Sequence, residues 1–251
     1  MAQTVIAVVN QKGGVGKTTS TINIAAQLAS SGKSVLLVDL DPQGNATSGL
    51  GLAKDQPVTM YELLCHGHKL SEAVLKTNVA QLFIVPSNIN LAGAEIELVN
   101  REHREFVLRE VLQVADYDYV IIDCPPSLGL LTINALTAAT LVLMPVQAEY
   151  YALEGLSQLL NTVQAVKHST NQNLELLGVV LTMYDKRTSL SEQVRDEVHK
   201  YFGDNLFKTV IPRNIRLAEA PSHGRTIFEH DKWSKGARAY KALTKEILAR
   251  T

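Results

Sequence analysis

The stretch VVNQKGGVGKTT, residues 8–19, follows a run of β-branched apolar residues and precedes a segment with helical periodicity. A Gly-rich turn between a strand and a helix is the context in which a P-loop binds phosphates. Glycines let the backbone turn tightly and point its N–H groups inward, and the positive end of the next helix adds to the attraction. We therefore expect Lys17 to reach the β- and γ-phosphates of a nucleotide and the Thr18 hydroxyl to ligate Mg²⁺.

Short apolar runs alternate with longer amphipathic segments along the chain. Several runs, such as VIAVV and YVIID, are apolar without alternation, which is typical of strands buried on both faces of a parallel sheet. This order predicts an α/β fold with a doubly wound, mostly parallel sheet flanked by helices, in a single P-loop ATPase domain spanning residues 1–251. The expected strands are 4–10, 34–39, 82–86, 119–123, 141–145, 176–182 and 209–211, and the expected helices are 18–30, 104–114, 130–139, 153–167, 190–202 and 237–249.

Two of the expected strands end in acidic residues. The segment VDLDPQGN carries Asp39 and Asp41, and YVIID ends in Asp123. Because α/β sheets bind ligands at the carboxyl ends of their strands, we expect all three carboxylates near the nucleotide. Asp123 fits the Walker B arrangement that holds Mg²⁺ through water; Asp39 would support the Mg²⁺ shell and Asp41 would orient the attacking water. The alternative for Asp41 is a carboxylate that only caps the Asp-Pro-Gln-Gly turn.

Composition excludes several classes of protein. Hydrophobic residues make up 46% of the chain, enough for a substantial core, and two cysteines, Cys65 and Cys124, make neither a disulfide framework nor a four-thiolate metal site. The N-terminus lacks the pattern of a signal peptide, and no apolar run is long enough to span a membrane, so we expect a cytoplasmic protein. The segment Cys65-His66-Gly67-His68 lacks a fourth metal ligand, and we do not expect a metal there.

Charge is unevenly distributed although the net charge is only −1. Residues 186–250 contain 14 Lys/Arg against 8 Asp/Glu, which leaves 10 of the 24 basic and 17 of the 25 acidic residues for the rest of the chain. A basic C-terminal quarter favours a polyanionic partner. An ordinary solvated helical surface would explain it as well.

The P-loop departs from the generic pattern, because Gln11 stands where G-x-x-x-x-G-K-[ST] has its first glycine and Lys12 follows it. The form K-G-G-x-G-K-[ST] resembles the deviant Walker A loop of the ParA/MinD/nitrogenase-iron-protein superfamily. The blocks LLVDLDPQGNATSGLG, LAGAEIELV, IIDCPPSLGLLTINAL, PVQAEYYALEGL and VIPRNIRLAEAPSHG extend the resemblance to the ParA/Soj class of chromosome-partitioning ATPases over essentially the whole chain. The two cysteines lack the spacing of the superfamily's cluster-binding members.

The resemblance implies functions for individual residues. Judged from the motif alone, Lys12 can be a further phosphate contact within its own subunit. The resemblance implies instead that Lys12 crosses a dimer interface and contacts the partner's nucleotide. It also ties Asp41 to hydrolysis, so that Lys12, Lys17 and Asp41 form the implied catalytic set. Pro212 and Asn214 would line the adenine, with Met183 nearby. The complete set expected to bind ATP or ADP is Lys12, Gly13, Gly14, Val15, Gly16, Lys17, Thr18, Thr19, Met183, Pro212 and Asn214.

The resemblance also implies partners. An ATP-bound homodimer would bind double-stranded DNA without sequence preference, which places the protein on the nucleoid, and a ParB/Spo0J-like centromere-binding protein would stimulate its ATPase. Such binding needs only neutralisation of phosphates and no motif that reads bases. Arg187 and Arg216 match the family's DNA-binding positions best. The further candidates are Lys186, Arg195, Lys200, Arg225, Lys232 and Lys235.

Three other functions fit the same motifs. A MinD-like positioning ATPase would bind membranes in place of DNA, and a nucleotide-gated regulator would act on replication initiation. A metabolic P-loop enzyme, such as a dethiobiotin synthetase or a small-molecule kinase, would need a pocket for a second substrate. Because only three residues precede the first expected strand, we expect no operator-binding helix-turn-helix in this chain.

Overall fold

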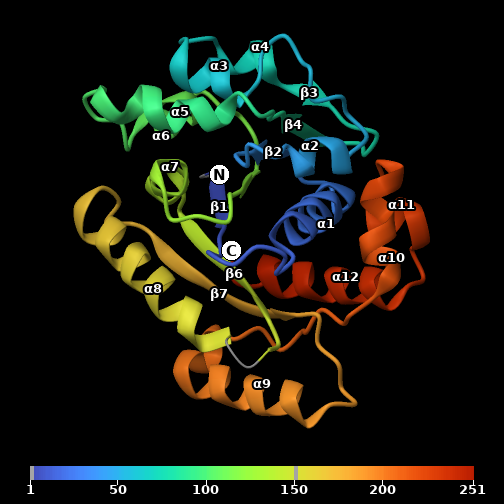
Figure 1. The fold of residues 1–251 in the computed structure, drawn as a ribbon. Helices are drawn as coiled ribbons and strands as arrows, with labels where there is room; N and C mark the ends of the chain where they lie inside the picture. Colours follow the sequence, from blue (N-terminus) through green and yellow to red (C-terminus); the bar gives the residue numbers. More distant parts are fainter. Residues whose placement is uncertain (1–2, 150–151) are drawn as a thin grey trace.

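The computed structural model describes residues 3–149 and 152–251. Within them, seven strands form one sheet in the order β3-β4-β2-β5-β1-β6-β7, with helices on both faces (Figure 1). All neighbouring strands run parallel except β3, which pairs antiparallel with β4 at the edge. The predicted mostly parallel, doubly wound α/β fold is thus confirmed. The strands are β1 Thr4–Val8, β2 Val35–Asp39, β3 Leu75–Lys76, β4 Leu82–Val85, β5 Tyr119–Asp123, β6 Leu141–Gln147 and β7 Glu175–Thr182.

Side-chain alternation along the central strand β1 divides the core into two halves. Val5 and Ala7 face one cluster of buried residues, which is covered by α3 and α5–α9. Ile6 and Val8 face the other, which is covered by α1 and α10–α12 (Figure 1). Both faces are apolar because helices cover both, which is the burial that an uninterrupted apolar run predicts.

The helices agree with the predicted segments where apolar periodicity is strong. The helices that match are α1 Lys17–Ser30, α6 Val107–Leu112, α7 Leu130–Ala138, α8 Ala152–Ser169, α9 Ser189–Phe202 and α12 Lys235–Leu248. Short helices in irregular segments were not predicted: α2 Asn45–Gly49, α3 Met60–Cys65, α4 Leu70–Ala73, α5 Leu91–Glu97, α10 Ile215–Glu219 and α11 Ile227–Asp231, with 3₁₀ turns at Leu98–Asn100, Gly203–Asn205 and Ala220–His223.

The predicted strand at residues 209–211 is wrong. The backbone N–H groups of Lys208 and Thr209 donate to the Glu246 carboxylate on α12, at 3.0 and 2.9 Å, and not to a neighbouring strand. Phe207 and Ile211 each donate one bond to β7, through Val179 O at 2.9 Å and Leu181 O at 2.8 Å, but the residues between them do not continue a ladder. Pro212 has no N–H to continue the ladder, so the segment stays a loop beside β7.

Helix α12 packs on the sheet as its apolar stripe predicts. Tyr240, Leu243 and Ile247 are buried, and the Tyr240 hydroxyl lies 3.0 Å from that of Ser20 on α1. Among residues 3–149 and 152–251, no helix combines the length and the apolar character that crossing a membrane requires.

Candidate functional site

The loop between β1 and α1 has the conformation that phosphate binding requires. Gly14 and Gly16 have φ of 73° and 88°, in the left-handed region that favours glycine, and α1 begins at the next residue, Lys17. The Lys17 side chain is buried, and its Nζ donates to the Lys12 carbonyl oxygen at 3.1 Å. Burial lowers the Lys17 pKa, and the Asp123 carboxylate opposes that shift. The ammonium therefore lies inside the loop, where an anion would gain most from it.

Contacts with the carboxyl ends of β6 and β7 hold this loop in place. The Asn10 amide donates to Pro145 O at 2.7 Å, and its Oδ1 accepts the N–H of Lys12 at 2.9 Å. From the other side, the Thr182 hydroxyl donates to Val15 O at 2.8 Å. These bonds fix the shape of the loop.

The second lysine of the loop lies apart from the first. Lys12 Nζ forms an ion pair with Glu149 Oε2 at 3.2 Å, and both side chains are about half exposed, at 52% and 45%. The Gln147 side chain donates to the other oxygen of Glu149. The structure thus places the Lys12 ammonium at the surface, outside the loop that contains Lys17. Glu149 was not among the predicted site residues, and no local motif indicates it.

Asp123 ends β5 directly below the loop, as predicted. Its Oδ1 accepts the Thr21 hydroxyl at 3.0 Å, and the nearby Thr18 hydroxyl acts to lower the pKa of this carboxylate. The other oxygen, Oδ2, is buried and has no partner in the described part of the structure. Burial, and then the neighbouring Asp39, raise the Asp123 pKa to about 8. An orphaned buried carboxylate oxygen beside a threonine hydroxyl suits a hard cation such as Mg²⁺.

Asp39 and Asp41 lie together at the end of β2. Asp39 is fully buried, and its Oδ2 accepts both the N–H and the hydroxyl of Thr47, at 2.8 and 2.7 Å, while its Oδ1 accepts the N–H of Asp41 at 3.3 Å. Burial raises the Asp39 pKa to about 6. Asp41 Oδ1 accepts the N–H of Gln43 at 2.9 Å. Asp41 therefore does cap the turn, and the same turn sets it at the carboxyl end of the sheet.

No cluster of three or more His, Cys, Asp or Glu side chains suited to a metal ion occurs among residues 3–149 and 152–251. Mg²⁺ in phosphate-binding sites commonly needs only one or two protein carboxylates, because substrate phosphates and water supply the rest. Thr18 and Asp123 fit that kind of site.

A cavity of about 320 Å³ adjoins the P-loop. Met183, Pro212 and Asn214 line it together with Gly16 and Thr19, so residues far apart in the sequence meet where the nucleotide base would lie. Met183 follows β7 with a φ of 50°, an uncommon conformation that turns the chain toward the Pro212 loop. Ile211, Arg213, Ile215, Leu217, Ala218 and Tyr240 also line the cavity but were not predicted.

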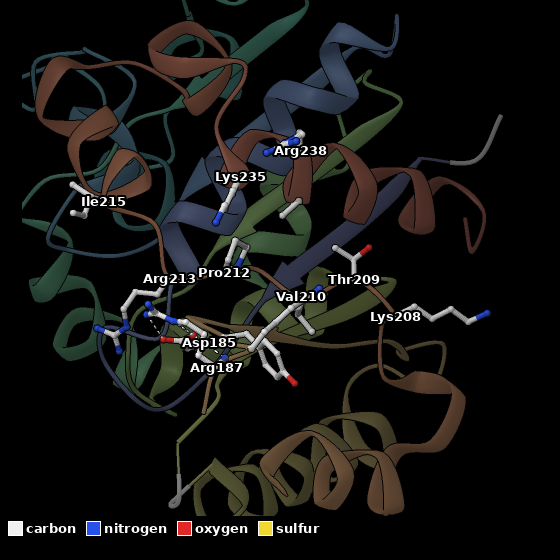
Figure 2. Close-up of a pocket in the computed structure, with 13 residues that line it drawn as sticks. Asp185, Arg187, Lys208, Thr209, Val210, Pro212, Arg213, Ile215, Lys235 and Arg238 are labelled. Carbon is white, nitrogen blue, oxygen red and sulfur yellow. Dashed lines mark hydrogen bonds and ion pairs between the residues drawn. The ribbon is translucent and has the colours of Figure 1, made fainter. Parts of the chain in front are cut away.

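A basic groove of about 870 Å³ lies between the loop after β7 and the start of α12 (Figure 2). It shares Pro212, Arg213 and Ile215 with the cavity that adjoins the P-loop, so the same loop lines both. Asp185 is the acid that lines it, and its carboxylate accepts two bonds from the Arg187 guanidinium, at 3.0 and 2.8 Å, which hold the Asp185 pKa at about 2. The basic residues that line the groove are Lys186, Arg187, Lys208, Arg213, Lys235 and Arg238.

The predicted DNA-binding residues do not all gather at this groove. Arg216 lies on α10, where it pairs with Glu219 at 2.9 Å and with Asp231 at 3.8 Å. Arg195 and Lys200 are exposed on α9 and do not line the groove. Lys208, Arg213 and Arg238 were missed, although Arg238 stands three residues from Lys235 and hence on the same face of α12. Arg225 and Lys232 are exposed outside it.

A larger cavity, of about 1010 Å³, lies at the opposite end of the sheet. Ser34, Gln81 and Tyr117, which line it, precede or begin the strands β2, β4 and β5. Ligands of such sheets bind at the carboxyl ends of the strands, and the P-loop and all three carboxylates lie there, so size does not locate the site.

Comparison with known proteins agrees with this geometry. A family model described as an AAA domain matches residues 3–176. The sporulation initiation inhibitor protein Soj of Bacillus subtilis is 57% identical over 248 residues, covering 98% of each chain. The chromosome partitioning protein ParA of Myxococcus xanthus is 52% identical over 249 residues, covering 98% of this chain and 88% of its own. This chain belongs to the ParA/Soj family of chromosome-partitioning ATPases.

A solved structure extends the comparison to ligands. A Mycobacterium smegmatis protein named cobyrinic acid a,c-diamide synthase was solved with bound ADP and magnesium. It matches this chain with a TM-score of 0.87 at 42% identity, and the match covers 98% of this chain and 94% of that protein. Its name is that of a metabolic enzyme, whereas the Myxococcus relative, at 52% identity, is named a chromosome partitioning protein.

Proposed function

We propose that this ParA/Soj family member is a dimerising ATPase switch that binds DNA without sequence preference in its ATP state. Slow, Mg²⁺-dependent hydrolysis of ATP to ADP and phosphate would return it to a form that releases DNA. The cycle would drive chromosome or plasmid partitioning on the nucleoid together with a ParB/Spo0J-like partner. The position of Lys12 is the observation that carries this proposal.

Lys12 is part of the loop that would bind the nucleotide, yet its ammonium lies at the surface on Glu149. Lys17 already supplies a buried ammonium within the loop. A half-exposed cation at the edge of an anion site suits a group that reaches into the site of a second copy. ATP would then bridge two subunits, with each Lys12 contacting the partner's phosphates.

The remaining residues of the site have separate functions in this proposal. The backbone N–H groups of residues 13–19 and the Lys17 ammonium bind the phosphates, and Met183, Pro212 and Asn214 enclose the adenine. Asn214 Oδ1 caps α10 by accepting the N–H of Arg216 at 2.9 Å, so its amide nitrogen is the polar atom offered to the base. Thr18 and Asp123 would hold Mg²⁺, and Asp39, whose carboxylate also bonds to Thr47, would support the Mg²⁺ shell.

Hydrolysis requires a water molecule aligned with the γ-phosphorus. Asp41 is buried at 7% exposure and held by its turn, so it can accept a proton of that water and orient its oxygen. The water oxygen bonds to phosphorus, the bond from phosphorus to the β,γ-bridging oxygen breaks, and ADP leaves. Mg²⁺, when bound, would neutralise charge on the phosphate oxygens.

The test is binding of a duplex of arbitrary sequence, measured with ATP, with ADP and without nucleotide, at two salt concentrations. Wild type and Asp41→Ala are compared, with Asp55→Ala as a matched control because Asp55 is an exposed acid outside the site. We expect binding only with ATP, stronger binding by Asp41→Ala, and a steep loss with salt because released counterions drive association.

Other outcomes would favour other functions. DNA binding that ignores the nucleotide would contradict the switch, and ATP-dependent binding to anionic vesicles in place of DNA would favour a MinD-like function. If a small polycarboxylate and not DNA occupies the basic groove and stimulates ATP turnover, a metabolic synthase becomes the better description. A role in replication initiation would require ATP-dependent binding to an initiator protein.

A further inference from the structure

The chain has a single tryptophan, Trp233, and its side chain is 79% exposed. Trp233 lies in the turn between α11 and α12, where its backbone N–H donates to Asp231 Oδ1 at 3.1 Å. The Ser234 hydroxyl caps α12 by accepting the backbone N–H of Ala237 at 3.0 Å. Both bonds fix the backbone on either side of the indole. Tryptophan is enriched at contact surfaces, because its ring offers a large apolar area and its ring N–H a polar group.

One cation lies over this ring, and a second follows it in the sequence. Lys232 Nζ lies 5.4 Å from the centre of the ring, and Lys235, two residues further, lines the basic groove. Asp231 also connects the turn to α10, because Arg216 lies 3.8 Å from its carboxylate. Ile215, which precedes Arg216 and lines the groove, is 75% exposed. Ile215 thus lines the basic groove, and Trp233 stands two residues from Lys235, which lines it too.

The charge of this surface favours a polyanion over a protein or a lipid bilayer. Within residues 3–149 and 152–251, four cations that line the groove form no ion pair: Lys208, Arg213, Lys235 and Arg238. Binding in a bilayer interface would call for a continuous apolar face, and here two apolar side chains stand apart among charges. Nucleic acid offers phosphates to the cations and apolar sugar and base surfaces to an indole.

We propose that Trp233 contacts duplex DNA directly, with its indole entering a groove of the duplex and packing on sugars and base edges while the basic groove holds the phosphates. This inference rests on the proposed function, since it concerns the DNA-bound state. The contact requires no sequence preference, because every base and sugar presents apolar surface, and apolar side chains inserted between base steps are a known way to bind DNA without base-specific hydrogen bonds.

DNA binding then has a salt-dependent part from the phosphate contacts and a salt-independent part from the indole, and each can be measured. Removing a phosphate contact, as in Lys235→Ala, should make the dependence of log affinity on log salt shallower by about 0.9. Removing the indole, as in Trp233→Ala, should weaken binding by about 5- to 100-fold at every salt concentration, because the apolar area buried by the ring is lost, and leave the slope unchanged. Trp233→Phe should retain most of the affinity. The two kinds of contact are therefore distinguishable without a structure of the complex.

The experiment uses the full chain with a slowly hydrolysed ATP analogue and a short duplex of arbitrary sequence. Tryptophan fluorescence reports on Trp233 alone, because the chain has no other tryptophan. Tyr201→Ala is the matched control, because Tyr201 is 71% exposed on α9, outside the basic groove. We expect DNA to change Trp233 emission, Trp233→Ala to bind weakly with an unchanged salt slope, and Tyr201→Ala to bind like wild type.

Two results would overturn the proposal. Equal DNA affinity of Trp233→Ala and wild type, with unchanged emission, would show that DNA binds elsewhere while the proposed switch survives. Emission that shifts with anionic phospholipid vesicles and not with DNA would assign Trp233 to a membrane. Absence of DNA binding by wild type in every nucleotide state would instead contradict the proposed function itself. Circular dichroism of each variant excludes loss of fold as the cause.

Discussion

The nucleotide end of the sheet and the basic surface beside it both depend on charge, but they hold it differently. At the nucleotide end Lys17, Asp39 and Asp123 are 7%, 0% and 0% exposed, and each is fixed by its position at a strand or helix end. At the basic surface, which comprises the basic groove and the neighbouring Arg216, the basic side chains are exposed, and Arg187 and Arg216 pair with acids. A buried charge needs a fixed partner because its desolvation is costly in free energy, whereas an exposed ion pair contributes little and can be exchanged for another. The nucleotide end therefore holds its charges in fixed positions, whereas the cations of the basic surface can change partners.

The largest effect should follow the loss of a buried charge. Lys17→Ala removes the ammonium enclosed by the P-loop, and hydrogen bonds to charged groups contribute about 1.5–3 kcal/mol, so ATP binding should weaken about 10- to 100-fold. Calorimetric titration measures the change, and Lys69→Ala is the control because Lys69 is exposed at the opposite end of the sheet. Similar ATP affinities for Lys17→Ala and Lys69→Ala would remove Lys17 from the phosphate site.

Stability without nucleotide and Mg²⁺ should fall as pH rises. The pKa values of Asp39 and Asp123 are raised to about 6 and about 8, so the folded state holds their protons more tightly than the unfolded chain does. The resulting stabilisation is complete below the unfolded carboxyl pKa near ~4 and is lost as pH passes about 6 and then about 8. Denaturant unfolding should show a loss of about 1–3 kcal/mol between pH ~6 and ~9.

Substitution of the buried acid separates this effect from other titrations. Asp123→Asn should flatten the upper part of the pH profile, since the amide does not titrate. Asp55→Asn, which alters an exposed acid, should leave the profile unchanged. A profile that keeps its slope in Asp123→Asn would assign the pH dependence to other groups.

A smaller effect is expected at the basic surface. Asp185→Asn would release Arg187 from its two-bond ion pair, and an unpaired guanidinium is free to bind a phosphate. DNA affinity should rise about three- to tenfold at low salt, and the salt dependence should steepen by up to about 0.9. Salt titrations of DNA binding measure both. Weaker binding by Asp185→Asn would mean that Asp185 positions Arg187 for DNA instead of competing with it.

The smallest effect concerns the exposed pair at the edge of the nucleotide site. Glu149→Gln should release Lys12, and exposed ion pairs contribute little, so ATP-dependent dimerisation should improve only about two- to fivefold per lysine. Light scattering across an ATP titration measures it, with Glu72→Gln as control, because Glu72 pairs with His68 elsewhere on the surface. Reduced dimerisation of Glu149→Gln would show that Glu149 helps Lys12 reach the partner.

The same comparison explains what the sequence could predict. Lys17, Asp39 and Asp123 follow from local pattern, because a strand end fixes where the next residues lie. Met183, Pro212 and Asn214 meet in one cavity although they come from two separate loops, and only the family resemblance indicated them. Their convergence depends on how β7 and the Pro212 loop pack, which periodicity does not encode.

The basic surface was predicted least well, for a related reason. Pairing of Arg187 with Asp185 is local, but that of Arg216 with Asp231 joins segments that the fold brings together. Which cations remain unpaired therefore depends on tertiary contacts, and a charge count over residues 186–250 gives only the overall sign. The wrong strand at residues 209–211 has a similar origin, since Glu246 lies 37 residues from Thr209.

The central place of β1 in the sheet has a consequence for synthesis. Strand β1 pairs with β5 and β6, so during synthesis it waits until residues 119–123 emerge before it gains a neighbour. The loop that follows it waits longer, because Asn10 bonds to Pro145 and Val15 to Thr182, residues 135 and 167 positions further along. A nascent chain that stops before β6 thus carries the whole phosphate-binding motif but lacks the contacts that shape it.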